Sequence, residues 1–192
     1  MIRCAMFILV GALAIFGSLY FYIFYSRAAT LTLVSDTIST SGLAGSADHI
    51  IKFTVNNSAP ASGMIVIAFE PGKFEIPVSF DYRDLDLSVD GVSKSLGSAA
   101  GGAVIGVGVV SGASGSVTFI LGSAAIAAGS VVTIKAGRNA SFEYSGLYQI
   151  KNPLSAGSYL ITVKTYDASM GLLDQASTKI MILESTRVTA AR

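Results

Sequence analysis

The chain has 192 residues, and its 13 basic and 12 acidic residues give a formal net charge of +1. The chain has neither an excess of basic residues nor a basic run, so nothing in its charge points to nucleic acid or an anionic lipid surface as a partner. Cys4 is the single cysteine, so residues 29–192 cannot form a disulfide within the chain. They are numerous enough for one domain, which packing and strand pairing must stabilise.

The first predicted element is the apolar run Cys4–Tyr25, which contains no charged residue. As a helix it would measure about 33 Å, close to the thickness of the hydrocarbon core of a bilayer. Its apolar side chains point in every direction, so lipid is the expected surrounding. Residues 4–25 are therefore the predicted membrane contact, and Arg3 favours a cytoplasmic N-terminus.

Two interpretations of residues 1–28 remain open. Small residues in Ser26-Arg27-Ala28 suit signal-peptidase cleavage before Ala29, near Ala28. The length of the apolar run favours a retained single-pass anchor instead. Either way, residues 29–192 are exported, so we expect a cell-envelope or secreted domain.

Short runs of β-branched and aromatic residues recur after residue 28, separated by turn residues. This pattern predicts an all-β sandwich or barrel. The expected strands are Thr30–Val34, His49–Asn56, Met64–Phe69, Leu85–Val89, Val104–Val110, Ser116–Leu121, Val131–Lys135, Ser158–Tyr166 and Thr178–Leu183.

Alternation within these runs predicts which side chains face the core. Ile51, Phe53 and Val55 should point inward, whereas Asp84 and its alternate neighbours should face solvent. Met64–Phe69 is apolar on both faces, which indicates a central or doubly covered strand. Reversals are expected at Pro71-Gly72, Asp90-Gly91, Ala128-Gly129 and Ala136-Gly137.

The order of several segments resembles uncharacterised bacterial secreted and cell-surface proteins with one Ig-like β-sandwich behind a signal or anchor. The segments are Leu85–Gly91, Ser116–Ser123, Ile126–Gly137, Ile150–Tyr159 and Val188–Ala190, after a start at Ala28–Thr37. The resemblance implies an Ig-like antiparallel fold and offers no catalytic residue to carry over. Ala156-Gly157-Ser158-Tyr159 is similar to a tyrosine corner, which implies a buried Tyr159 whose phenol bonds to backbone.

Two strand segments are candidate sites, each with a structural alternative. The carboxylates of Asp81, Asp84, Asp86 and Asp90 could bind Ca²⁺, or they could form a solvated strand face. The glycine-rich, uncharged run Ala103–Val110 could pair edge to edge with another copy, or lie within its own sheet.

Catalytic chemistry has little support. His49 is the single histidine, no nucleophile elbow occurs, and a zinc site would need more ligands. We therefore expect no enzyme, no cofactor and no metal site. A lysine–asparagine cross-link would have to use Lys52 or Lys135 with Asn139 or Asn152. Four aromatic residues could contact carbohydrate, namely Phe80, Tyr82, Tyr144 and Tyr148.

The sequence thus favours an exported structural or adhesive module that could self-assemble or contact another cell-surface component. The alternative is an extracellular module that binds carbohydrate or peptide. Concentration-dependent oligomers would distinguish the first hypothesis from the second.

Overall fold

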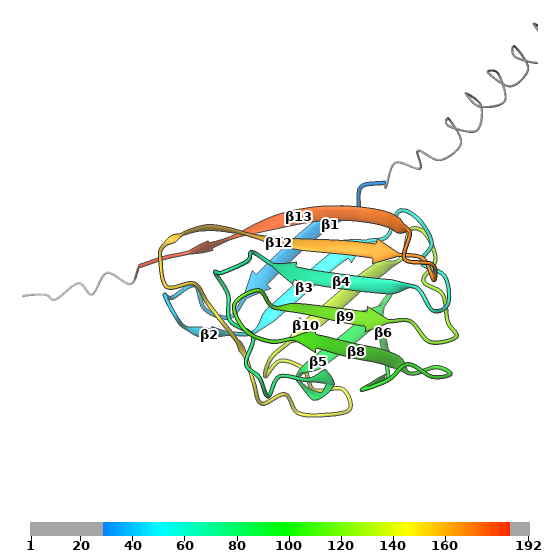
Figure 1. Cartoon of the computed structure of the whole chain (residues 1–192), viewed down its shortest axis with the longest axis horizontal. Helices are drawn as coiled ribbons and strands as arrows, with labels where there is room; N and C mark the ends of the chain where they lie inside the picture. Colours follow the sequence, from blue (N-terminus) through cyan, green and yellow to red (C-terminus); the bar gives the residue numbers. More distant parts are fainter. Residues whose placement is uncertain (1–28, 185–192) are drawn as a thin grey trace, which may run out of the picture.

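The computed structural model describes residues 29–184, which form two facing β-sheets and one small sheet (Figure 1). The five-stranded sheet has the order β1 (Thr32–Ile38), β3 (His49–Thr54), β10 (Val131–Ala136), β5 (Leu85–Val89), β6 (Val92–Lys94). The six-stranded sheet has the order β13 (Leu172–Ile182), β12 (Gly157–Tyr166), β4 (Met64–Phe69), β9 (Ser116–Ile120), β8 (Ile105–Val110), β7 (Leu96–Gly97). The small sheet pairs β2 (Ser46–Ala47) with β11 (Ile150–Lys151), and a 3-10 turn, η1 (Tyr82–Asp84), precedes β5.

The predicted all-β class is confirmed, and the arrangement is consistent with a β-sandwich. Within residues 29–184, no helix has the length and hydropathy needed to cross a bilayer. The predicted membrane segment Cys4–Tyr25 and the proposed cleavage position lie outside the described residues.

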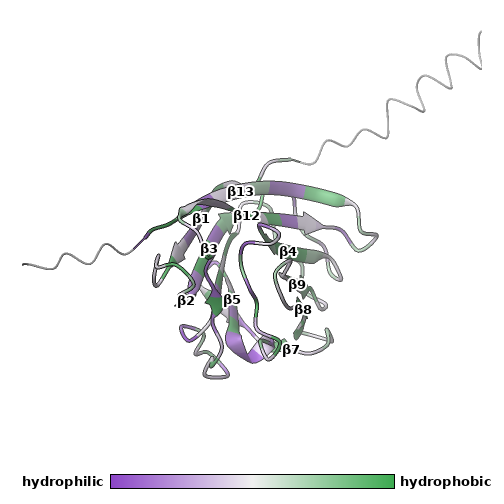
Figure 2. Cartoon of the chain, turned by 60° about the vertical axis from the view of Figure 1, so that its left-hand side comes forward, coloured by the Kyte–Doolittle hydropathy of each residue, from purple (hydrophilic) through white to green (hydrophobic). Residues whose placement is uncertain are grey.

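The core lies between the two main sheets and is built from alternate residues of facing strands. Ile51, Phe53 and Val55 are at most 1% exposed, as their alternation predicts. Val117 and Phe119 of β9 fill the core from the opposite sheet. Burying each such side chain contributes about 1.5–3 kcal/mol. In Figure 2 the strands accordingly change between hydrophobic and hydrophilic colours along their length.

β4 confirms the expectation drawn from its two apolar faces. It pairs with β12 on one side and β9 on the other, in the interior of its sheet. Ile65, Ile67 and Phe69 are buried in the core, whereas Met64 and Val66 are half-buried on the outer face.

The structure corrects two sequence predictions. β13 begins at Leu172, earlier than the predicted start at Thr178, because its whole length pairs with β12. β1 begins and ends later than predicted, at Thr32 and Ile38.

β13 also contacts the first described residue, since Ala29 N–H donates to Leu173 C=O at 2.9 Å.

The Asp90-Gly91 reversal is confirmed as a tight hairpin turn between β5 and β6. Asp90 and Gly91 have φ values of 51° and 80°, and Val89 pairs with Val92 across the turn. Positive φ at both central residues is the requirement of a type I′ turn, which explains the Asp-Gly sequence.

Tyr159 has the buried position and the backbone hydrogen bond that a tyrosine corner requires. Its side chain is 6% exposed, and its phenol donates to the Ser155 carbonyl at 2.8 Å. The Ser155 hydroxyl also lies 2.8 Å from the Tyr159 phenol oxygen, and Phe74 packs edge-on against the Tyr159 ring. The phenol thus ties the start of β12 to the segment before it.

We predict that Tyr159→Phe lowers the free energy of unfolding by about 1 kcal/mol, because the Ser155 carbonyl loses its buried donor. Urea denaturation of the full chain measures the change. Tyr166→Phe is the matched control, since the Tyr166 hydroxyl makes no hydrogen bond to the described residues. Equal stability of Tyr159→Phe and the parent chain would contradict the structural role.

Candidate functional site

The first candidate site is a part of the molecule without charge. Residues 95–134 contain no Asp, Glu, Lys, Arg or His, although 13% of the chain is charged. This charge-free segment forms β7, β8 and β9 and leads into β10. It includes the predicted run Ala103–Val110, so the absence of charge extends well beyond one strand.

The outer face of β4, β9 and β8 continues this uncharged surface. Its cross-strand rows are Met64–Ile120–Gly106, Val66–Thr118–Gly108 and Ala68–Ser116–Val110. The outer face of the other sheet carries charges instead, including Lys52 and the opposed pair Lys135 and Asp86. The β4–β9–β8 part of one outer face and the outer face of the other sheet therefore differ in what they can contact without desolvating charge. The uncharged part ends at β12, where Lys164 pairs with Val66.

The edge of β8 is open to pairing along part of its length. β7 pairs with β8 only at Ile105 and Gly106, and Ile105 N–H donates to Ser95 C=O at 2.9 Å. Because backbone groups alternate along a strand, Val107 and Val109 also direct their N–H and C=O away from β9. Within residues 29–184, no strand pairs with Val107 and Val109 on that side.

The two glycines of β8 have different roles. A side chain at Gly106 would meet the backbone of Ala100 at 2.3 Å, so this glycine is required by close packing. A side chain at Gly108 would meet nothing within 4 Å. β8 is thus paired in its own sheet through β9, which was the structural alternative, whereas edge-to-edge pairing of Ala103–Val110 with another copy stays a prediction.

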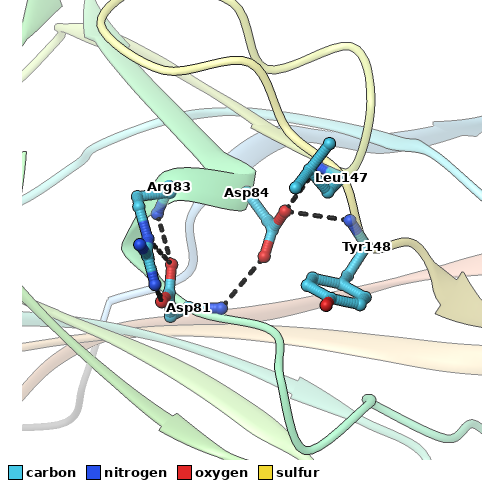
Figure 3. A network of polar contacts seen from close by, with 5 residues as sticks. All are labelled: Asp81, Arg83, Asp84, Leu147 and Tyr148. Carbon is cyan, nitrogen blue, oxygen red and sulfur yellow. Dashed lines mark hydrogen bonds and ion pairs between the residues drawn. The ribbon is translucent and has the colours of Figure 1, made fainter.

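The second candidate site is the loop 137–149, which buried and half-buried carboxylates hold in place. Asp84 is 3% exposed and accepts from Asp81 N–H at 3.1 Å, Leu147 N–H at 2.7 Å and Tyr148 N–H at 2.9 Å (Figure 3). Asp86 accepts from Ser141 N–H at 2.8 Å and from Phe142 N–H at 3.1 Å. These bonds fix the loop backbone at both of its ends.

These contacts correct the predicted orientation of Asp84, which is buried and does not face solvent. They also weigh against the calcium hypothesis, because the carboxylate oxygens of Asp84 and Asp86 already accept hydrogen bonds from backbone N–H groups. Asp90 accepts from Val131 N–H at 2.8 Å, and Asp81 pairs with Arg83. In the described part of the chain, no group of three His, Cys, Asp or Glu could hold a metal ion.

Beside this loop lies a pocket of about 310 Å³, lined by Ser79, Asp81, Arg83, Asp84, Tyr144, Ser145, Leu147 and Tyr148. Tyr82 packs edge-on against Tyr144, with ring centroids 5.5 Å apart. Arg83 lies 5.7 Å from the Tyr82 ring, and its Nε donates to both oxygens of Asp81 at 3.1 Å. Of the four aromatic candidates from the sequence, Tyr144 and Tyr148 line this pocket and Tyr82 packs against Tyr144, whereas Phe80 is a core residue.

Two titratable groups of this pocket have pKa values shifted by their neighbours. Hydrogen bonds from the Arg83 side chain lower the pKa of Asp81 below its ordinary value. The neighbouring Tyr82 raises the pKa of the Tyr144 phenol above its ordinary value. At neutral pH the pocket thus presents an ionised Asp81–Arg83 pair and a neutral Tyr144 phenol.

His49 lies in the core rather than at a surface site. It is fully buried, its Nδ1 lies 2.7 Å from Asp36 Oδ2, and Phe69 and Phe74 pack edge-on against its ring. Its Nε2 has no hydrogen-bond partner in the described structure. The arrangement connects β3 to β1 and presents no histidine nitrogen to a substrate.

The residues considered for a cross-link are engaged elsewhere. The Asn139 amide donates to the His49 carbonyl at 3.1 Å, and the Asn152 amide donates to the carbonyls of Thr40 and Gly42. Lys52 and Lys135 lie on outward positions of β3 and β10. The structure does not bring a lysine and an asparagine of this set together.

No family model and no curated protein matches the chain. Among solved structures, it is similar to BslA, described as a bacterial hydrophobin, with 14% identity, TM-score 0.43, and 83% of this chain and 97% of that chain covered. A collagen-binding domain of a Staphylococcus aureus adhesin matches with 8% identity, TM-score 0.40 and coverages of 78% and 96%. AvmM, described as catalysing macrocyclization in alchivemycin A biosynthesis, matches with 7% identity, TM-score 0.37 and coverages of 86% and 97%. These values are too low to assign a family or a function.

We predict that Asp84→Asn destabilises the domain by about 1–3 kcal/mol, because an amide cannot accept from three N–H groups. Urea denaturation measures the loss, and hydrogen exchange should accelerate at Leu147 and Tyr148. Glu143→Gln is the control on the same loop, since its carboxylate accepts only the Ser95 hydroxyl among the described residues. Unchanged exchange in Asp84→Asn would show that the loop is held by other contacts.

Proposed function

We propose that the protein is an exported, non-catalytic module with a structural or adhesive role at the cell envelope. Residues 4–25 anchor it in the membrane, or cleavage near Ala28 releases it. Residues 29–192 form its Ig-like sandwich, a proposal supported by the sequence resemblance and by the Tyr159 contact. The module associates with further copies of itself through the charge-free segment 95–134.

The observation that carries this proposal is the charge-free segment with the open edge of β8. Natural sheet edges are commonly protected by charged residues, prolines or bulges, and β8 has no charged residue and no proline. In a two-fold symmetric contact, each residue near the axis meets its own copy or a close neighbour. An uncharged strand can make this contact without like-charge repulsion, which favours a second copy as the occupant.

The proposed absence of catalysis is supported by the location of the chemically reactive residues. His49 is enclosed by the core, and the carboxylates nearest to one another bind backbone N–H groups. Among the described residues, this leaves no histidine or free carboxylate pair at a pocket.

We predict that Gly108→Lys reduces self-association of the full chain, measured by light scattering over a range of concentrations in mild detergent. The lysine side chain has open space on the outer face, so the domain should fold normally. Two lysines brought together across a symmetric contact would repel each other. Thr37→Lys is the matched control, because Thr37 is exposed on β1, the edge of the other sheet.

Val109→Pro tests the same contact without adding charge. Proline removes the Val109 N–H, which points away from β9, so the pairing within the sheet should persist. The expected result is weaker association for Gly108→Lys and Val109→Pro and parental association for Thr37→Lys. A parent chain that stays monomeric at high concentration, or variants that associate as the parent does, would overturn the proposal.

A further inference from the structure

The pocket beside loop 137–149 has a fixed shape before any ligand arrives. Asp84 accepts hydrogen bonds from the backbone of Leu147 and Tyr148 (Figure 3). Asp86 accepts from the backbone N–H of Ser141. The side chains of Tyr144 and Tyr148 nevertheless remain 44% and 42% exposed. Exposed rings on a fixed backbone lose little conformational entropy on binding, which favours recognition over packing as their use.

The pocket offers hydrogen-bond donors and acceptors, and its two solvent-accessible charged side chains, Asp81 and Arg83, pair with each other. Asp84 is satisfied by three N–H donors, and Asp81 and Arg83 neutralise each other. Four hydroxyl groups line the pocket as well, from Ser79, Tyr144, Ser145 and Tyr148. An anionic ligand would meet Asp81, and a cationic ligand would meet Arg83, so a neutral ligand with several hydroxyl groups suits the pocket best.

The tyrosine rings add flat apolar surfaces to this polar set. A sugar ring combines apolar C–H faces with hydroxyl groups around its rim, and it can contact the rings and the Asp81–Arg83 pair together. The volume of about 310 Å³ is at the small end of ligand pockets, which suits one sugar unit rather than a long segment.

We propose that this pocket binds one unit of a neutral saccharide, with Tyr148 and Tyr144 packing on the sugar ring and Asp81 and Arg83 bonding its hydroxyl groups. The pocket shares no lining residue with the charge-free segment 95–134 and gives the module a second way to adhere. The lowered pKa of Asp81 keeps the carboxylate ionised in weakly acidic surroundings, so binding should be constant between neutral and mildly acidic pH.

The test uses the full chain in a sugar-free polyoxyethylene detergent and oligosaccharides of glucose, galactose, mannose and N-acetylglucosamine. Polygalacturonate serves as the acidic probe. Because the chain has no tryptophan, the ultraviolet difference spectrum reports on tyrosine alone. We expect at least one neutral probe to perturb this spectrum saturably, and titration calorimetry to give the dissociation constant.

Variants then assign the binding to the pocket. Tyr148→Ala should weaken binding about tenfold, as truncated aromatic anchors do, while Tyr148→Phe should retain most of it. Arg83→Lys should weaken binding because the planar pairing with Asp81 is lost. Phe142→Ala is the matched control, since Phe142 is 52% exposed on the same loop but does not line the pocket.

Three results would overturn the proposal: no response to any of the four neutral probes, stronger binding of polygalacturonate, or equal losses in Phe142→Ala and Tyr148→Ala. The circular dichroism spectrum and melting temperature of each variant establish that it is folded. Self-association is measured in parallel with Gly108→Lys, whose saccharide binding should equal that of the parent chain.

Discussion

Hydrogen bonds from backbone N–H groups to a few carboxylates hold the long connections of this domain. Asp84 fixes loop 137–149, and the fully buried Asp174 accepts from the N–H groups of Asn56 and Asn57 at 3.1 and 2.9 Å. Residues 29–192 contain no cysteine, so a disulfide cannot perform this role. A carboxylate in the folded core is costly unless its oxygens are satisfied, and the loops supply the donors. The loops and the core therefore depend on each other.

The uneven distribution of charged residues gives this domain two different surfaces, the charge-free segment 95–134 and the pocket beside loop 137–149. Acidic residues are used where a loop must be held, and basic residues lie on both main sheets, as Lys52 and Lys164 do, and on the loops. Within residues 95–134, the strands β7, β8 and β9 are paired in one sheet. Their surface is left uncharged, while the aromatic pocket forms at a carboxylate-held loop.

Much of the fold was predictable because alternate residues report directly on burial. Ile51, Phe53 and Val55 illustrate this, and Tyr159 was recognisable from its local sequence. Asp84 was placed on the wrong side because its partners, Leu147 and Tyr148, are far away in sequence. The first part of β13 was missed because its polar residues resemble a loop until β12 pairs with them. Tyr144 and Tyr148 were named as aromatic candidates, but neither the pocket that they line nor the ion pair between Asp81 and Arg83 was predicted.

The contact of Ala29 with β13 affects how an anchored form of the domain would be oriented at the membrane. Ala29 donates to the Leu173 carbonyl, and its own carbonyl accepts from Gln175 N–H at 3.0 Å, so two hydrogen bonds hold Ala29 on β13. With an anchor ending at Tyr25, the intervening backbone could extend only about 14 Å. The retained form would hold the β1–β13 corner beside the lipid headgroups and restrict tumbling of the whole sandwich. A form cleaved before Ala29 would keep both bonds, since the new amine still donates, and would be free to diffuse.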